Sequence, residues 1–313
     1  MNIAFIGHSF HQRTSSDAFF LRLLHRLGTV KEYYDTFWQG ERASWIPGFD
    51  ARDYDCVVVW QVIEAFNYLP EHPNLVFVPM YDNIAPKGTV RWLKRFSRTK
   101  ILCFCEELYK QVSPRAPQAL YHKYYPDPAE YPTARHDRTL RGLFWRRVRA
   151  IDEKVIARLC DGTVFDRFTL HDAPDPFSGL RPAVLEKIPS REIERTVWLP
   201  ERDAFLRILA QNNVCFAPRP REGIGMNMLD AMAMGLCVVA PDAPTQNEYI
   251  RHGVNGLLYD LAKLKPLNFE RADELGRRAR TSIEEGFAKW ALREDRLVEF
   301  IADPALRNRA WFA

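Results

Sequence analysis

The chain has 313 residues, of which 47% are hydrophobic and 27% are charged. This composition excludes an intrinsically disordered chain, and the length allows two compact domains of ordinary size. The 44 basic and 40 acidic residues give a formal charge of +4, too balanced to argue for a nucleic-acid partner. No apolar run is long enough to span a bilayer and the N-terminus lacks a secretory signal, so we expect a cytoplasmic protein.

The six cysteines form no Cys-x-x-Cys pair, and four of them lie in or beside strand-like apolar runs. Buried cysteines in such runs usually act as small apolar side chains. We therefore expect reduced, buried thiols rather than a disulfide framework or a metal site.

Short apolar runs alternate with helical segments in the first part of the chain. Residues 3–6 are predicted to form a strand, and residues 17–27 an amphipathic helix. Further strands are predicted at 56–60, 75–79 and 101–104. This alternation predicts a parallel sheet with helices on both faces.

A proline-rich segment, residues 114–138, interrupts this alternation and is interpreted as the last strand of one domain followed by a linker. Beyond it a helix is predicted at about 148–159, and residues 271–301 have helical spacing. The second set of predicted strands is 140–145, 165–170, 196–199, 214–216 and 238–240. We therefore predict an α/β fold with two Rossmann-like domains facing a cleft, residues 1–130 and 131–290.

Ligands of open α/β sheets bind beyond the carboxyl ends of the strands. The segments expected at those ends are 7–16, 81–87, 145–149, 219–225 and 242–247. Functional residues are therefore expected in these segments.

Two acids flank a glycine-rich turn in the second half of the chain. Glu222 precedes Gly223, Ile224 and Gly225, and Asp230 follows on a predicted helix, eight positions after Glu222. Eight helical positions span about 12 Å, comparable to the distance from the sugar to the ribose of a nucleotide sugar. Carboxylates can accept paired hydrogen bonds from vicinal hydroxyls, and the turn and helix N-terminus favour a diphosphate. The alternative is a methionine-rich core helix with incidental acids.

A basic cluster follows the strand predicted at 140–145. Arg146, Arg147 and Arg149 stand next to Trp145 at the expected start of a helix. Guanidinium groups bind phosphate oxygens bidentately and can neutralise a departing diphosphate. The alternative is a solvated helix start, which the helix dipole disfavours for cations.

Three further residues in the first half are candidates for a site. The hydroxyls and amides of Ser15 and Ser16 are suited to phosphate binding, although N-capping of the next helix is the alternative. Asp82 is a candidate for contacting sugar hydroxyls, and a turn formed with Asn83 is its alternative.

The run Arg91–Lys100 contains five cations and no acid, with Trp92 and Phe96 four positions apart. Such a run suits peripheral contact with an anionic membrane surface, where lipid-linked acceptors reside. The alternative is a solvated helix whose aromatic side chains pack inward.

The acids and glycines belong to a longer motif. Residues 218–235 read Pro-Arg-Pro-Arg-Glu-Gly-Ile-Gly-Met-Asn-Met-Leu-Asp-Ala-Met-Ala-Met-Gly, and residues 252–258 read His-Gly-Val-Asn-Gly-Leu-Leu. This resembles the Glu-x7-Glu donor motif and the Gly-x-x-Gly-Leu-Leu segment of the family-4 glycosyltransferases with the GT-B fold. The resemblance implies that Glu222 lies near the donor sugar and that Asp230, in place of the second Glu, lies near the ribose. It also implies that Arg146 and Arg149 match the family's phosphate-binding Arg and Lys.

The resemblance implies a retaining, metal-independent transferase that moves a sugar from a UDP- or GDP-linked donor, without a further cofactor, to a glycan or lipid-linked acceptor. It points to surface polysaccharide or glycolipid synthesis, such as lipopolysaccharide or capsule, at the inner face of a membrane. Residues 291–313 are expected to form a last helix that crosses back to the first domain. Two alternatives are a catalytically silent sugar-nucleotide-binding or scaffold protein and a GT-B-like nucleotide-sugar epimerase.

Overall fold

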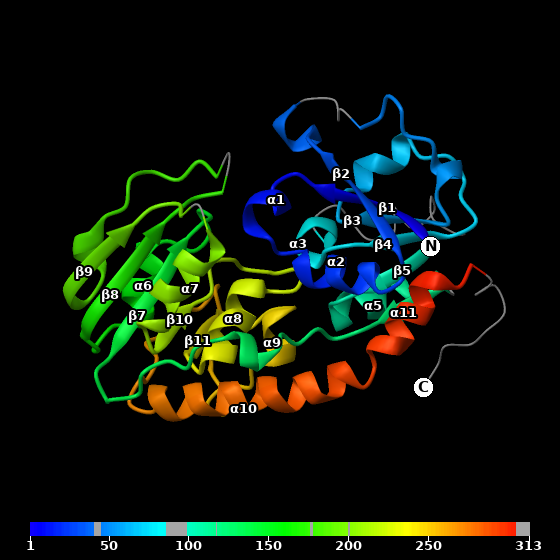
Figure 1. The fold of residues 1–313 in the computed structure, drawn as a ribbon. Coiled ribbons are helices and arrows are strands. Elements are labelled where there is room, and N and C mark those ends of the chain that lie inside the picture. Colours follow the sequence, from blue (N-terminus) through cyan, green and yellow to red (C-terminus); the bar gives the residue numbers. More distant parts are fainter. Residues whose placement is uncertain (41–44, 86–98, 117, 176–177, 200, 305–313) are drawn as a thin grey trace. The chain divides into compact units, whose positions relative to one another are not determined.

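A computed structural model describes residues 1–40, 45–85, 99–116, 118–175, 178–199 and 201–304. The chain divides into two compact units: unit 1 comprises residues 1–124 and 290–313, and unit 2 comprises residues 125–289 (Figure 1). Each unit contains one six-stranded sheet whose strand pairs are all parallel. The predicted α/β class with two Rossmann-like sheets is therefore confirmed.

The sheet of unit 1 has the order β2-β1-β3-β4-β5-β6. Its strands are β1 (Asn2–His8), β2 (Thr29–Asp35), β3 (Cys56–Trp60), β4 (Leu75–Val78), β5 (Lys100–Cys103) and β6 (Ala119–Tyr121). The α-helices that the structure describes in this unit are α1 (His11–Thr14), α2 (Ala18–His25), α3 (Tyr81–Ile84), α5 (Glu106–Val112) and α11 (Glu294–Ala302).

The strands that were predicted in this half are those with continuous apolar runs. All five residues of β3 are buried, as expected for a central parallel strand covered on both faces. The sequence did not predict β2, which is about half exposed and carries Lys31 and Glu32. Because β2 is an edge strand, charged side chains are compatible with its position and remove the apolar signal.

The C-terminal helix α11 is fixed to the sheet of unit 1 by a buried lysine. Lys100 Nζ donates hydrogen bonds to the carbonyl oxygens of Phe300 (2.6 Å), Ile301 (2.9 Å) and Asp303 (3.1 Å). Asn74 Nδ2 also donates to Ile301 O at 3.1 Å. An ammonium group at the carboxyl end of a helix satisfies the last carbonyls and complements the helix dipole.

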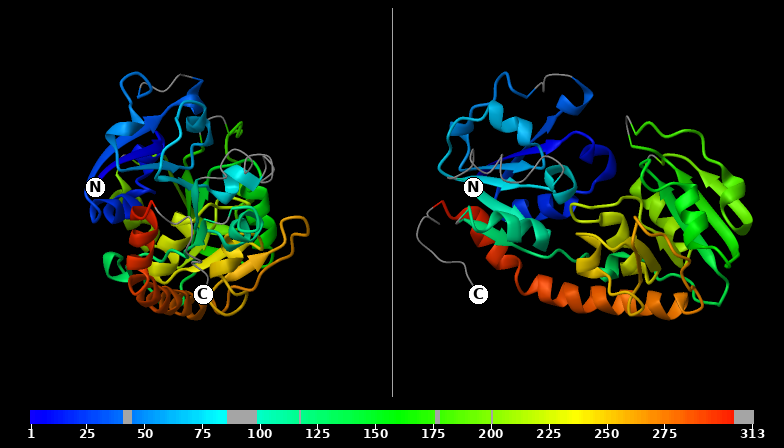
Figure 2. Two further views of the ribbon diagram at one scale, coloured as in Figure 1. Left: turned by 90° about the vertical axis from the view of Figure 1, so that its right-hand side faces the viewer. Right: turned by 180° about the vertical axis from the view of Figure 1, so that it is seen from behind.

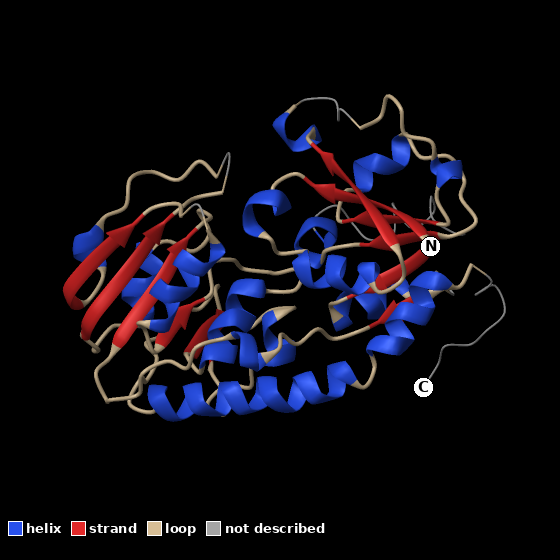
Figure 3. Cartoon of the chain, in the orientation of Figure 1, coloured by secondary structure: helices blue, strands red, loops and turns tan. Residues whose placement is uncertain are grey.

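The sheet of unit 2 has the order β12-β11-β10-β7-β8-β9. Its strands are β7 (Arg141–Arg146), β8 (Phe165–Asp172), β9 (Ser190–Thr196), β10 (Val214–Phe216), β11 (Cys237–Pro241) and β12 (Leu257–Tyr259). Its helices are α6 (Glu153–Leu159), α7 (Arg202–Ala210), α8 (Met226–Met234), α9 (Gln246–Tyr249) and nearly all of α10 (Ala272–Ala291). Figure 3 shows the strands of this sheet with helices packed beside them.

One predicted strand of unit 2 was displaced. The sequence placed a strand at 196–199, whereas β9 occupies Ser190–Thr196. This edge strand has no fully buried residue and is rich in charged residues, so only its last residue, Thr196, lies within the predicted range.

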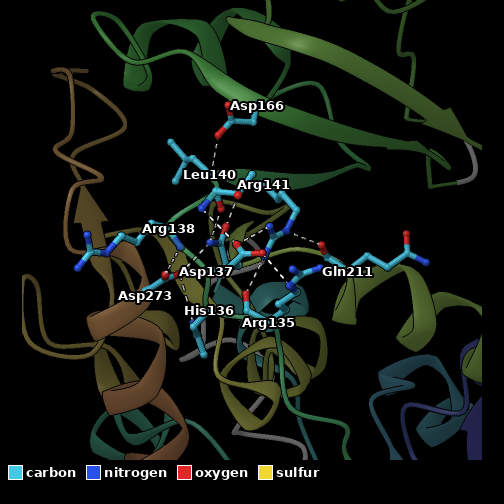
Figure 4. A network of polar contacts seen from close by, with 11 residues as sticks. Arg135, His136, Asp137, Arg138, Leu140, Arg141, Asp166, Gln211 and Asp273 are labelled. Carbon is cyan, nitrogen blue, oxygen red and sulfur yellow. Dashed lines mark hydrogen bonds and ion pairs between the residues drawn. The ribbon is translucent and has the colours of Figure 1, made fainter.

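The start of β7 is held by a polar network at the amino end of the strand (Figure 4). Arg141 donates to Asp137 Oδ1 at 2.8 Å, to Arg135 O at 2.7 Å and to Gln211 O at 3.0 Å. The Arg141 guanidinium lowers the pKa of Asp137 to about 2. This network lies at the strand end opposite Arg146, so it fixes the strand without occupying the carboxyl edge of the sheet.

The long helix α10 packs against α8 within unit 2 (Figure 2). Arg280 NH1 donates to Ala233 O, near the end of α8, at 2.6 Å. A Cβ added at Gly276 would approach Gly235 O to 2.1 Å, so only glycine permits this close packing.

All six cysteines lie within the described residues, are buried and form no disulfide, as predicted. Burial raises the pKa of Cys56, Cys160 and Cys237 to about 12, which keeps these thiols protonated at neutral pH. Among the helices of the described ranges, none is sufficiently long and apolar to cross a membrane.

Candidate functional site

The topology of unit 2 marks one position on its sheet. From β7 the chain proceeds to β8 and β9 on one side, and then returns to β10, β11 and β12 on the other. Such a reversal opens a crevice at the carboxyl ends of the two strands that flank it. Here those strands are β7, which ends at Arg146, and β10, which ends at Phe216.

Arg147 is the first residue after β7 and lies at this edge. Its Nε donates to Asp175 Oδ1 at 2.8 Å, and its guanidinium carbon lies 4.3 Å from the centre of the Trp145 ring. Trp145 is itself fixed because its Nε1 donates to Ala173 O at 2.8 Å. The Trp145 ring and the Asp175 carboxylate therefore hold the guanidinium in one orientation.

A second arginine meets the same carboxylate. Arg219, in the loop after β10, donates from NH2 to Asp175 Oδ2. Burial, and secondly the nearby charge of Arg219, lowers the pKa of Arg147, whereas Asp175 and Glu222 oppose this shift. Two guanidinium groups therefore converge on the Asp175 carboxylate, and such fixed cationic donors suit the binding of an anion.

The turn that carries Glu222 is fixed from the loop after β11. Thr245 Oγ1 donates to Glu222 O at 2.8 Å, and Gln246 Nε2 donates to Arg219 O at 3.0 Å. Both donor residues are fully buried. Thr245 therefore fixes the backbone of Glu222, and its neighbour Gln246 fixes the backbone of Arg219.

Gly225 is the N-cap of α8 and has a φ of 86°. This left-handed conformation favours glycine, and a Cβ here would approach Met228 Cε to 3.0 Å. The helix that was predicted to carry Asp230 is thus confirmed as α8, and its N-cap follows directly after Gly223 and Ile224, both of which are buried.

Arg146 does not fit the phosphate-binding role that was predicted for it. The residue is 3% exposed, and its guanidinium contacts Glu153 Oε2 and Asp172 Oδ1, both at 3.1 Å. It also donates to the carbonyl of Arg181. Because successive side chains of a strand point to opposite faces, Arg146 is directed into these buried acids while Arg147 lies at the edge.

Arg149 lies three residues beyond β7 and is exposed. Within the part of the chain that the structure describes, its side chain makes no hydrogen bond or ion pair. The structure therefore leaves the predicted role of Arg149 open and gives it no fixed orientation.

Asp230 lies on α8, as predicted, but its carboxylate is enclosed. The residue is 4% exposed, and its Oδ1 accepts hydrogen bonds from Tyr131 Oη and Arg202 NH2, both at 2.7 Å. Burial raises the pKa of Asp230, whereas the charge of Arg202 and the hydrogen bond from the Tyr131 hydroxyl act to lower it. The Arg202 side chain, at the start of α7, is 34% exposed and is therefore a charged partner of Asp230 that solvent can reach.

Three of the predicted site residues belong to unit 1. Ser15 ends α1 with a φ of 51°, and Ser16 Oγ lies 2.8 Å from His11 Nδ1. Asp82 is partly buried in α3, after β4. They occupy carboxyl-end segments of the unit 1 sheet, as Arg147 and Glu222 do in unit 2.

Most of the run predicted to contact a membrane, residues 91–98, lies outside the described residues, as do residues 86 and 87. Lys100, the last cation of the run, is 3% exposed and is hydrogen-bonded to the end of α11. Lys100 is therefore excluded from any surface contact. The described residues contain no group of three or more His, Cys, Asp or Glu side chains that could hold a metal ion.

Sequence reasoning did not assign roles to Asp175, Arg219 or Thr245. Asp175 follows β8 by three residues, and its position beyond a strand end was the available signal. Arg219 stood within the quoted motif, but only the structure shows that it shares Asp175 with Arg147.

A buried imidazole beneath the site makes the stability of the fold dependent on pH. Burial, and secondly the charge of Arg147, lowers the pKa of His171 from 6.5 to about 4. The unfolded chain therefore binds the proton more readily than the folded protein does. The free energy of unfolding is thus unaffected by His171 above pH 6.5, and it decreases by up to about 3 kcal/mol as the pH falls through the folded-state pKa near 4. His171→Gln should flatten the fall of the unfolding midpoint over this range; an unchanged pH profile would contradict this assignment.

Residues 176–267 match the family described as Glycosyl transferases group 1. No match was found among curated proteins.

The solved structures that resemble this chain include three sugar-processing proteins. Anabaena HepE in complex with UDP-glucose is 15% identical with a TM-score of 0.62, over 96% of this chain and 99% of that one. Sucrose-phosphate synthase from Thermosynechococcus elongatus is 13% identical with a TM-score of 0.67, over 95% and 98%. The lipopolysaccharide outer core galactosyltransferase WaaB, in its apo form, is 14% identical with a TM-score of 0.62, over 96% and 99%.

Proposed function

We propose that this chain, which has the GT-B fold and whose residues 176–267 match the group 1 family, is a glycosyltransferase. We propose further that unit 2 binds the nucleotide-sugar donor at the carboxyl ends of β7 and β10. The sugar is then transferred to a glycan or lipid-linked acceptor, which we assign to unit 1. The observation that carries this proposal is the pair of arginines, Arg147 and Arg219, which share Asp175 at the strand reversal.

The pair of guanidinium groups suits the diphosphate of the donor. The diphosphate would be held by the guanidinium groups of Arg147 and Arg219 together with the backbone amides at the start of α8. When the bond to the sugar breaks, negative charge grows on the departing diphosphate, so fixed guanidinium groups stabilise that state more than the ground state. Because guanidinium groups can neutralise this charge without a metal ion, we propose a metal-independent reaction.

Glu222 is proposed to hold the donor sugar. Its backbone is fixed by Thr245, and its charge acts on Arg147. A carboxylate in this position would accept hydrogen bonds from sugar hydroxyls and would orient the anomeric carbon. By the resemblance of the motif we propose that the anomeric configuration is retained.

The nucleoside end is proposed to involve Arg202 rather than a free Asp230 carboxylate. Asp230 is enclosed by Tyr131 and Arg202, so it acts on a ligand through the groups that it holds. The donor base is proposed to be uracil or guanine. UDP-glucose is the donor to test first, because the similar Anabaena protein was crystallised with it. Surface polysaccharide or glycolipid synthesis at the inner face of a membrane is the proposed setting, and it is supported by the similarity to the lipopolysaccharide galactosyltransferase.

A thermal-shift panel tests donor binding. We expect UDP-glucose or GDP-mannose to raise the unfolding midpoint, since a ligand at one hundred times its dissociation constant stabilises the fold by about 2.7 kcal/mol. Glucose and mannose without the nucleotide are the controls and should give no shift. If no nucleotide or nucleotide sugar of the panel shifts the midpoint at millimolar concentration, the proposed donor site is wrong.

A further inference from the structure

A single carboxylate, that of Asp175, connects the two arginines of the proposed donor site. Its Oδ1 accepts from Arg147 Nε at 2.8 Å and lies 2.6 Å from Arg147 NH2. Its Oδ2 accepts from Arg219 NH2. Each guanidinium group therefore has one oxygen of this carboxylate, and the loss of either oxygen would remove the contact with one arginine.

Asp175 is itself bonded to the residue whose side chain it holds. Its backbone N–H donates to Arg147 O at 3.1 Å, and its carbonyl accepts from Ser178 N at 3.1 Å. The side chains of Asp175 and Arg147 are only 16% and 13% exposed. Water and salt therefore screen this ion pair less than they screen a pair on the open surface.

The carboxylate occupies only one edge of the Arg147 guanidinium. Nε and NH2 contact Asp175, and one face of the group lies on the Trp145 ring. Among the described residues, NH1 has no hydrogen-bond acceptor. A guanidinium group carries five N–H donors, so Arg147 can donate to a ligand while Asp175 keeps it in place.

The two guanidinium groups repel each other, and the carboxylate between them offsets this repulsion. Burial, and secondly the charge of Arg219, lowers the pKa of Arg147, whereas the charges of Asp175 and Glu222 raise it. The Arg219 side chain is partly exposed. Without Asp175, the repulsion would favour an Arg219 side chain that turns towards solvent and away from Arg147.

We propose that Asp175 is a positioning residue, which holds the guanidinium groups of Arg147 and Arg219 where the diphosphate of the donor binds. This inference rests on the proposed function. Asp175 does not contact the diphosphate, because two anions repel each other, and it acts through the two arginines. An anion-binding site thus requires a carboxylate whose own charge opposes the anion.

The positioning role and a role through charge alone predict opposite results for Asp175→Asn. If the carboxylate acted on the ligand only by its charge, the removal of that charge would strengthen the binding of an anion. If it positions the arginines, the asparagine amide offers one oxygen as an acceptor and turns an NH2 group towards the second guanidinium. One arginine then loses its acceptor, and the diphosphate is bound less tightly.

The test measures the dissociation constants of UDP and uridine by calorimetric titration, or those of GDP and guanosine if the thermal-shift panel selects guanine. We expect the UDP dissociation constant to rise about tenfold or more in Asp175→Asn, the scale of a lost hydrogen bond to a charged group. The dissociation constant of uridine, which has no phosphate, should change by less than about twofold. Asp175→Glu keeps the charge and both oxygens, so it should bind UDP more tightly than Asp175→Asn does.

Asp137→Asn is the matched control, because Asp137 is also a carboxylate shared by two arginines of unit 2 (Figure 4). Asp137 contacts Arg135 Nε at 2.7 Å and Arg141 NH1 at 2.8 Å. This cluster lies at the amino end of β7, whereas Asp175 holds Arg147 beyond the carboxyl end. The control removes the same charge from the same kind of ion pair, and it should leave the affinities for both ligands unchanged.

An Asp175→Asn protein that binds UDP as tightly as the wild type, or more tightly, would overturn the inference. Equal losses of UDP and uridine affinity would also overturn it, because they would indicate a distorted unit, as would an equal loss in Asp137→Asn or an Asp175→Glu protein that binds UDP no better than Asp175→Asn. If Asp175→Asn does not fold, Asp175→Ser is measured in its place with the same expectations. Failure of the wild type to bind any nucleoside diphosphate would instead contradict the proposed function.

Discussion

Replacing Arg147 by glutamine is expected to lower kcat/KM about 10³-fold. Its guanidinium is held against Asp175 and the Trp145 ring at the strand reversal of unit 2. A fixed cation at a departing diphosphate is typically worth 10²- to 10⁵-fold in rate. The measurement is steady-state donor turnover, together with the affinity for UDP, which should also weaken.

Arg149→Gln is the control for this substitution. Arg149 is exposed, and no contact within the described residues orients it, so its replacement should change kcat/KM by less than about threefold. Equal losses in both variants would show that the basic cluster acts only through its total charge. If Arg147→Gln retained wild-type activity, the diphosphate could not lie where we place it.

Replacing Arg146 by methionine is expected to lower the free energy of unfolding by about 3–5 kcal/mol. Arg146 is the buried partner of Glu153 and Asp172, and removing one member of a buried ion pair leaves uncompensated charge in the interior. Urea unfolding followed by circular dichroism measures the loss.

Arg195→Gln is the matched control, because Arg195 also pairs with Asp172, at 2.6 Å. The Arg195 side chain is 53% exposed, so its ion pair should contribute less than about 1 kcal/mol. A loss below 1 kcal/mol in Arg146→Met would contradict the structural role that we assign to Arg146.

The sequence predicted the central strands and the turn at Glu222 because both are local patterns. β3 and β10 are short, continuous apolar runs, and they were predicted at the residues where they occur. Edge strands such as β2 are half exposed and charged, so they lack that pattern.

The adjacent arginines could not be assigned from the sequence. Successive side chains of a strand point to opposite faces, so an error of one residue in the predicted strand end reverses the faces assigned to Arg146 and Arg147. The sequence alone does not show which of the two lies at the site. The enclosure of Asp230 depends on Tyr131 and Arg202, which are 99 and 28 residues away from it. No local motif contains such long-range partners, and the same holds for the contact of Arg219 with Asp175.

The most direct test of the account is donor turnover in Glu222→Ala, with Glu270→Ala as a control at an exposed site. The substrate is the nucleotide sugar that gives the largest thermal shift. We predict that release of the nucleoside diphosphate falls at least 10²-fold in Glu222→Ala and is unchanged in Glu270→Ala, since we propose that Glu222 orients the sugar for bond cleavage. Release at the wild-type rate from the Glu222→Ala protein would contradict the assignment of this site.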